Sequence, residues 1–179
     1  MKGVILILLF ATVLSDNILT TLNALIVSKM TRECIGATLA YIFEVSQFKS
    51  CIYQESYKKK LGNISFNEYC DRVNKGTYSA NSFINDSVGF GLAQWKVSTA
   101  KQKLLEDCKG KIGDFDCQLK FLIKTMKQYG PWSILTESHN VKECTKAVLL
   151  KYARPPIQDP VIQKEIYEYA LIYYDRFKY

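Results

Sequence analysis

Apolar residues recur every three or four positions along most of the chain, which is the pattern of amphipathic helices. Within the segment 31–48, Ile35, Leu39 and Ile42 follow this spacing behind Thr31, a residue suited to the N-cap. The same pattern predicts further helices over 16–30, 65–76, 98–110, 114–130, 141–156 and 159–177. The pattern therefore predicts a mainly helical fold.

Local signals mark the ends of some of these helices. Ser65 and Glu68 stand three residues apart, in the register of a capping box, and Gly76 follows at the exit of that helix. Asp159 and Pro160 fit the N-cap and first position of the last helix. These signals are independent of the apolar spacing and place the same boundaries.

The helical pattern breaks at residues 77–95, "TYSANSFINDSVGFGLAQW". Small polar residues alternate there with aromatic ones, and two glycines lie close together, which favours an irregular loop or a short hairpin over a helix. We therefore expect an α+β fold that is mainly α, with a small β-hairpin insertion before the middle of the chain.

The chain opens with a short basic start and an apolar run over residues 3–14. This run is shorter than the roughly 20 residues that span a bilayer, and it predicts a secretory signal peptide over residues 1–15. A cleavage nearer Ala24, or an ordinary buried helix, is the alternative. The remaining residues, 16–179, suit one domain with a sizeable core.

Six cysteines agree with export, because an even number in an exported domain predicts disulfides. They are Cys34, Cys51, Cys70, Cys108, Cys117 and Cys144. We expect three disulfides whose connectivity is open among 15 pairings, with Cys108–Cys117, across a Gly-containing turn, and Cys51–Cys70 as the favoured pairs. The usual zinc-ligand spacings are absent and His139 is the sole histidine, so we expect no metal and no cofactor.

The formal net charge of +7 predicts attraction to anionic surfaces such as membranes and bacterial walls. Lys58–Lys60 is the only run of three basic residues, so the clustered pattern of nucleic-acid binding is weak, and a solvated face is the alternative reading of this run. We expect peripheral attraction to anionic surfaces, no nucleic acid, and a monomer. Export and disulfides together favour a secreted protein or one within the secretory or endolysosomal pathway.

Glu44 is the one formally charged residue between Ile35 and Phe48. Apolar neighbours and the nearby helix C-terminus both oppose ionisation, so the pKa of its carboxyl should be raised. A carboxylic acid that stays protonated near neutral pH suits a general acid. A half-exposed helix residue is the alternative.

Seven motifs then occur in a recognisable order: "AYIFEVSQF", "YKKKLG", "DRVNKGTYS", "DSVGFGLAQW", "QLKFL", Trp132 and "LLKYARPP". Their order and spacing over residues 22–177 resemble the phage-tail-lysozyme family of peptidoglycan-cleaving domains. Glu44 takes the position of the family's glutamate. The resemblance implies a lysozyme-like α+β fold and a muramidase activity on the glycan strand.

Several positions depart from the family pattern. Val45 follows the glutamate where the family has serine, and Ser46 comes one residue later. Phe90 replaces the usual Tyr, Lys96 the usual Thr, and Ala153 an acidic residue. These departures leave open a descendant that binds glycan without cutting it.

The resemblance also implies a set of substrate-binding residues: Ser46, Gly89, Phe90, Gly91, Gln94 and Trp95. Gly89 and Gly91 would let the backbone approach a sugar chain closely. Gln94 offers a donor and an acceptor, and Trp95 a flat wall for a cleft. A tight turn that packs its indole inside is the alternative.

A glycosidase commonly uses a second carboxylate, for which Asp86 is the candidate because it precedes the glycine turn. A backbone cap is the alternative role of Asp86. Glu55 and Asp71 are further candidates, and a mechanism with one glutamate, including lytic transglycosylation, stays open. We expect a secreted peptidoglycan glycosidase; a chitinase-like enzyme and a non-catalytic wall-binding protein are the alternatives.

Overall fold

The computed structural model describes residues 16–153 and 159–177, so the expected signal peptide over 1–15 lies outside the described residues. The described part is mainly helical, as the apolar pattern predicts. Its elements are α2 (Asp16–Val27), α3 (Arg32–Ser46), η1 (Glu55–Tyr57), α4 (Phe66–Asn74), α5 (Ala80–Asn85), α6 (Ser98–Asp107), α7 (Phe115–Tyr129), α8 (Trp132–Glu137), α9 (Val141–Lys146), η2 (Ala147–Ala153) and α10 (Pro160–Arg176). None of the described helices is long and apolar enough to cross a membrane.

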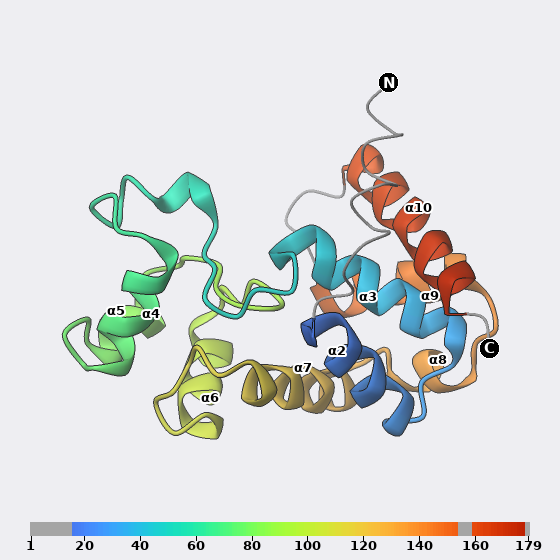
Figure 1. Ribbon diagram of the computed structural model, residues 1–179, viewed down its shortest axis with the longest axis horizontal. Coiled ribbons are helices and arrows are strands. Elements are labelled where there is room, and N and C mark those ends of the chain that lie inside the picture. The colour runs from blue at the N-terminus through green and yellow to red at the C-terminus, as the bar shows by residue number, and fades with distance from the viewer. Residues whose placement is uncertain (1–15, 154–158, 178–179) are drawn as a thin grey trace.

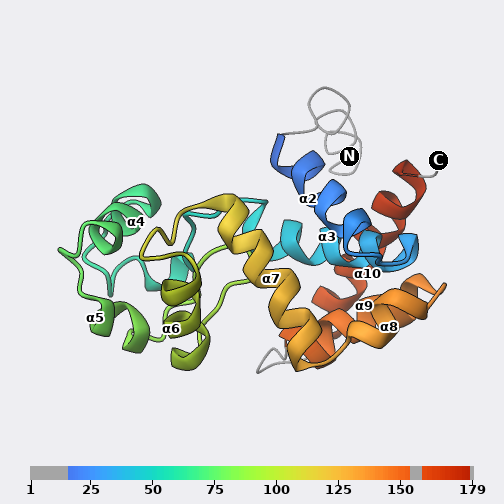
Figure 2. The same ribbon diagram turned by 90° about the horizontal axis from the view of Figure 1, so that it is seen from below.

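The helices form two groups joined by one long helix. Figures 1 and 2 show α4, α5 and α6 at one end of the molecule and α2, α3, α8, α9 and α10 at the other, with α7 running between them. The C-terminal end of α3 points toward the α4–α6 group (Figure 1). The last turn of α3 therefore lies on the side of the larger group that faces the smaller one.

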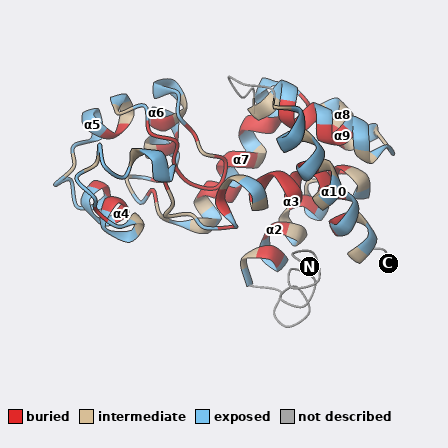
Figure 3. Cartoon of the chain, turned by 90° about the horizontal axis from the view of Figure 1, so that it is seen from above, coloured by how far each residue is buried: buried red, intermediate tan, exposed pale blue. Residues whose placement is uncertain are grey.

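Helix α3 is the central element of the larger group, and most of its residues are buried (Figure 3). It packs closely against α10 at Gly36, where an added Cβ would lie 2.8 Å from the Ala170 carbonyl oxygen. This close approach requires glycine at position 36. The absence of a side chain at Gly36 therefore lets α10 pack closely against α3, the helix that carries Glu44.

The predicted helix boundaries are confirmed where local chemistry sets them. The Ser65 side chain accepts a hydrogen bond from the Glu68 N–H at the start of α4. The Asp159 side chain accepts one from the Val161 N–H, with Pro160 in the first turn of α10. Thr31 precedes α3 as expected, but its hydroxyl donates to the Ser138 carbonyl instead of capping α3.

The structure corrects the prediction for residues 77–95. Helix α5 forms within this segment, with the Ser79 side chain accepting from the Ser82 N–H. The expected β-hairpin is not shown: the described residues form two isolated antiparallel bridges, between Tyr53 and Phe90 and between Phe90 and Trp95. The Phe90–Trp95 bridge closes a tight turn, and the Tyr53–Phe90 bridge joins that turn to the segment after α3, so the segment 77–95 is a helix followed by a turn.

Three further elements escaped the sequence analysis, the first of which is the short 3-10 helix η1. Helix α8 is too short for its apolar spacing to be distinguished from a loop. Residues Ala147–Ala153 continue from α9 as π-helical turns, which the apolar pattern alone does not separate from an α-helix.

The three expected disulfides are present. Cys108 pairs with Cys117 and Cys51 with Cys70, as favoured from the sequence. The third disulfide joins Cys34 of α3 to Cys144 of α9, across a sequence separation of 110 residues. It links the glutamate-bearing helix to a helix from the C-terminal part of the chain.

Candidate active site

Glu44 is an exposed residue in the last turn of α3. The helix ends just beyond it because Gln47 adopts a left-handed conformation, with φ of 51°, and donates its backbone N–H to the Phe43 carbonyl. Among the described residues, no hydrogen bond or ion pair holds the Glu44 carboxyl. The group is therefore accessible and unengaged.

The pKa of the Glu44 carboxyl is raised above its ordinary value, as expected from the sequence. Partial burial against the surrounding protein is the larger cause, and the nearby Glu165 carboxylate of α10 is the second. The pKa of Tyr169 is also raised. Burial is the largest cause, and the charges of Glu44 and Glu165 are the next. Glu44, Glu165 and Tyr169 are thus electrostatic neighbours, and the arrangement favours a protonated Glu44.

The Asp86 side chain is nearly enclosed and fully engaged with donors. Its side chain is 6% exposed and forms an ion pair with Lys101, which is itself completely buried. The hydroxyl of Tyr69 and, at 3.2 Å, that of Tyr78 donate to one carboxylate oxygen, and the Val88 N–H donates to the other at 2.8 Å. The carboxylate therefore organises the start of the glycine-rich turn from inside the protein.

This environment perturbs the groups around Asp86. Burial lowers the pKa of Lys101, while the hydrogen bond to Asp86 opposes that change. Burial, followed by the Asp86 charge, raises the pKa of Tyr78 to about 12. Burial also raises the pKa of Tyr69. Tyr69 and Tyr78 therefore stay neutral donors at physiological pH, and Asp86 keeps both hydrogen bonds.

The glycines of the turn serve close packing within the protein. Gly91 has φ of +74°, and an added Cβ would overlap the side-chain amide of Gln118. The same Gln118 oxygen accepts from the Leu92 N–H at 2.8 Å, and its Nε2 donates to the Ser50 carbonyl at 2.9 Å. Gln118 thereby ties the turn to the segment that follows α3.

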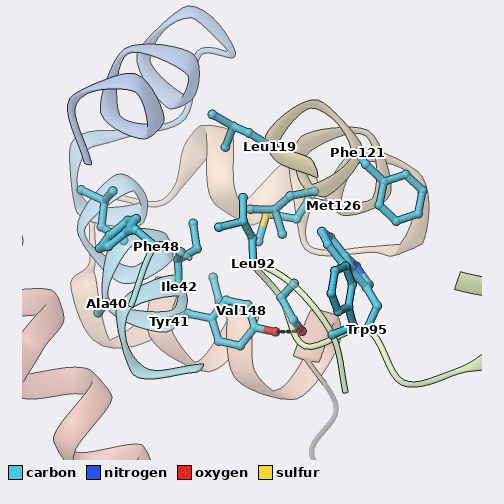
Figure 4. Packing of buried hydrophobic residues seen from close by; sticks show 14 of the residues in the cluster. Ala40, Tyr41, Ile42, Phe48, Leu92, Trp95, Leu119, Phe121, Met126 and Val148 are labelled. Atoms are coloured by element: carbon cyan, nitrogen blue, oxygen red, sulfur yellow. Dashed lines mark hydrogen bonds between the residues drawn. The ribbon is translucent and has the colours of Figure 1, made fainter. Parts of the chain in front are cut away.

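The remaining candidate substrate-binding residues are largely turned inward. Phe90 and Ser46 are buried, and the Ser46 hydroxyl donates to the Ile42 carbonyl one turn back in α3. Trp95 is 7% exposed, packs edge-on against Phe121, and donates its indole N–H to the Tyr152 hydroxyl at 3.3 Å. Figure 4 shows Trp95 beside Phe121 in the apolar core.

Gln94 is the partly exposed member of the motif. Its Nε2 donates to the Gly91 carbonyl at 3.1 Å, while its Oε1 is buried without a partner among the described residues. Gly89 lies directly against this amide, since an added Cβ there would be 3.0 Å from the Gln94 Oε1. The Gln94 side chain therefore closes the turn on itself.

A hydrogen bond joins the turn to the helix of Glu44. The Tyr41 hydroxyl, buried in the core, donates to the Ala93 carbonyl at 2.9 Å. Figure 4 shows Tyr41 pointing from α3 toward the turn that carries Leu92. Tyr41 precedes Glu44 by three residues, so the structure brings the glutamate helix and the glycine motif together.

The two reserve carboxylates lie on other elements. Glu55 is exposed at the start of η1. Asp71 is exposed on α4 and pairs with Lys75 at 3.7 Å. Within the described ranges, no group of three or more His, Cys, Asp or Glu residues forms a metal-binding cluster.

Three contributors escaped the sequence analysis: Lys101, Gln118 and Glu165. Lys101 resembles an ordinary polar position of an amphipathic helix, and Gln118 opens the motif "QLKFL" without any sign of its role; only the fold buries the two side chains. Glu165 is far from Glu44 in the sequence, and no motif or spacing links the two residues.

Comparison with protein families gives one relevant match. The model of a family described as phage tail lysozyme matches residues 16–177. The comparisons with curated proteins and with solved structures gave no match.

Proposed function

The chain belongs to the phage tail lysozyme family, and we propose that it is a secreted glycosidase that cleaves the glycan strand of bacterial peptidoglycan, with Glu44 as the general acid. The family membership suggests a lysozyme-like, peptidoglycan-cleaving activity. The observation that carries the residue assignment is the accessible Glu44 carboxyl at the end of α3, with its raised pKa. It occupies the position of the family's glutamate in the sequence.

The chemistry requires a protonated acid beside the glycosidic oxygen. A carboxyl with a raised pKa holds its proton closer to neutral pH and donates it as the bond to the leaving sugar breaks. Partial burial and the Glu165 charge both act in this direction at Glu44. Glu165 thus supports the proton donor electrostatically.

Asp86 receives a different role from the one expected of a second carboxylate. Its oxygens already accept from Lys101, two tyrosines and a backbone N–H, and the side chain is almost fully enclosed. A nucleophile or base must reach the sugar or a water molecule. We therefore assign Asp86 to holding the glycine-rich turn in place.

The motif residues Ser46, Gly89, Phe90, Gly91 and Trp95 support the site in the same way, because their surfaces are buried against the protein. Gln94 is partly exposed, and because its amide is held within the turn we assign it to van der Waals contact with the glycan rather than to hydrogen bonding. The turn is fixed to the Glu44 helix through Tyr41 and Ala93. In this proposal the glycine-rich turn forms a rigid wall next to the accessible Glu44 carboxyl.

Secretion is supported by the disulfides and by the amino-terminal pattern of residues 1–15. Three disulfides, and no free cysteine among the described residues, fit an oxidising compartment. Removal of the leader would leave the matched region, which begins at residue 16, intact.

Product analysis tests this function. The protein, produced through a secretory route so that its disulfides form, is incubated with purified peptidoglycan and with chitin oligomers, and the products are weighed. New reducing ends from peptidoglycan are the expected result, and anhydro-sugar ends would make the enzyme a lytic transglycosylase. Cleavage of chitin alone would contradict the substrate, and binding without products would contradict catalysis.

A further inference from the structure

Two lysines from separate segments meet over one tyrosine ring. The Lys60 Nζ lies 5.6 Å from the ring centroid of Tyr57, and the Lys96 Nζ lies 5.3 Å from the same centroid. Lys60 follows η1, whereas Lys96 directly follows Trp95 of the glycine-rich turn. The other lysine–aromatic contacts in the described part of the chain, such as Lys103 on Tyr129, have one cation for each ring.

The two ammonium groups have no carboxylate partner within residues 16–153 and 159–177. Glu55, the acidic residue nearest to Tyr57 in the sequence, forms no ion pair there. Both lysines are exposed, and two like charges near one ring repel each other. Such a pair gains most from an anion that binds between them.

The pair is attached to the proposed active site. The Lys60 Nζ donates to the Asp86 carbonyl at 3.0 Å, at the start of the glycine-rich turn. Lys96 leaves the other end of the same turn, after the bridge between Phe90 and Trp95. The two cations therefore flank the turn that Tyr41 binds to the Glu44 helix.

We propose that Lys60 and Lys96, held over Tyr57, form an anion subsite that takes a carboxylate of the peptidoglycan substrate. This inference rests on the proposed function. Peptidoglycan carries carboxylates on its muramic acid residues and peptide stems, whereas chitin is neutral. The subsite therefore favours wall polymer over chitin and supplies binding rather than chemistry.

The test measures binding in a Glu44→Gln background, so that cleavage does not consume the polymer. Sedimentation with insoluble peptidoglycan, stripped of accessory anionic polymers, gives the affinity. The double variant Lys60→Gln/Lys96→Gln should bind about fivefold more weakly, as expected for two exposed ion pairs. Lys58→Gln/Lys59→Gln is the matched control, because it removes the same charge from the same exposed lysine run without touching the Tyr57 pair.

A second polymer isolates the carboxylates. Peptidoglycan whose carboxyl groups have been converted to amides should bind wild-type and Lys60→Gln/Lys96→Gln protein equally. If both double variants bind peptidoglycan equally more weakly than wild type, the basic surface is diffuse and the subsite is wrong. If neither variant binds more weakly, the subsite is also wrong. The single variant Lys96→Gln keeps the Lys60 hydrogen bond to Asp86, so the turn should stay folded. This variant should show part of the loss of affinity for peptidoglycan.

The outcome is separable from that of the proposed function. If wild-type protein binds peptidoglycan through this pair but yields no products, catalysis fails and the subsite stands. If it cleaves peptidoglycan and the carboxyl-blocked polymer binds as well as the native one, the subsite is wrong and the function stands.

Discussion

The Tyr41 hydroxyl donates a hydrogen bond to the Ala93 carbonyl at 2.9 Å, and this bond connects α3 to the glycine-rich turn. Both residues are buried, so the bond is made without competition from water. Glu44 lies three residues beyond Tyr41, and Gln94 directly follows Ala93. This enclosed polar contact therefore helps to set the relative position of the proposed proton donor and the turn, together with the Gln118 hydrogen bonds to Leu92 and Ser50.

Tyr41→Phe should reduce both stability and cleavage. The Ala93 carbonyl would lose its donor inside the protein, which costs about 1–3 kcal/mol. Cleavage should fall because the turn is no longer fixed to the Glu44 helix. Urea denaturation and release of soluble wall fragments measure the two effects. Tyr167→Phe is the control, because Tyr167 of α10 is only partly buried, and unchanged cleavage by Tyr41→Phe would contradict the coupling.

Glu44→Gln should lower cleavage by about 10²–10⁴-fold, the usual contribution of general acid catalysis. The substitution keeps the shape of the side chain and removes its ionisable proton. Glu137→Gln is a matched control, because Glu137 is an exposed glutamate at the end of α8. Equal cleavage by Glu44→Gln and wild type would make Glu44 an ordinary surface residue.

The same variant should hold or gain stability at neutral pH. A carboxyl with a raised folded pKa binds its proton more tightly when folded, so its stabilising effect is present at low pH. That effect is lost as the pH rises through the unfolded and then the folded pKa. Replacing Glu44 removes this loss, and the melting temperatures of wild type and variant should converge in acid.

Glu165→Gln should shift the alkaline limb of the kcat/KM profile to lower pH. The Glu165 charge is the second cause of the raised pKa of Glu44, so neutralising it lowers that pKa, while burial continues to raise it. Added salt should shrink the difference between the variants, because Glu165 is exposed. Glu168→Gln, one turn along α10 and paired to Lys164, should leave the limb in place.

Lys101→Met should be strongly destabilising, by about 3–5 kcal/mol, because it leaves the Asp86 carboxylate buried without its cation. Denaturant unfolding measures the loss. Lys103→Met, two residues along α6 and exposed, should change stability little. Adding Asp86→Asn to Lys101→Met should restore part of the loss, and simple additivity of the two changes would contradict a buried pair.

Features set by neighbouring residues were predictable from the sequence. The Ser65 cap, the Asp159–Pro160 start of α10 and the Cys108–Cys117 disulfide all act over a few positions. The raised pKa of Glu44 was also predictable in direction, because its neighbours along α3 are apolar. The resemblance of the motifs pointed to the family that the match over residues 16–177 shows.

The site as an arrangement was less predictable. "DSVGFGLAQW" looked like a hairpin open to substrate, yet most of it packs inward, because Gln118 and Tyr152 come from distant helices to meet it. Asp86 was the sequence's candidate for a second carboxylate, and only the fold shows that its side chain is enclosed with Lys101. A sequence shows which residues carry charge or a ring, but not which of them lose contact with water.

The sequence alone thus determined the longer helices, the caps at Ser65 and Asp159, the even set of cysteines and the isolated acid at the end of α3. Only the tertiary structure decided that Cys34 meets Cys144, that Glu165 lies near Glu44, and that Lys60 and Lys96 share the ring of Tyr57. The physical reason is the distance along the chain over which each kind of interaction acts. Propensity and capping depend on residues within one or two turns, whereas burial and charge pairing depend on segments that only the packed chain brings into contact.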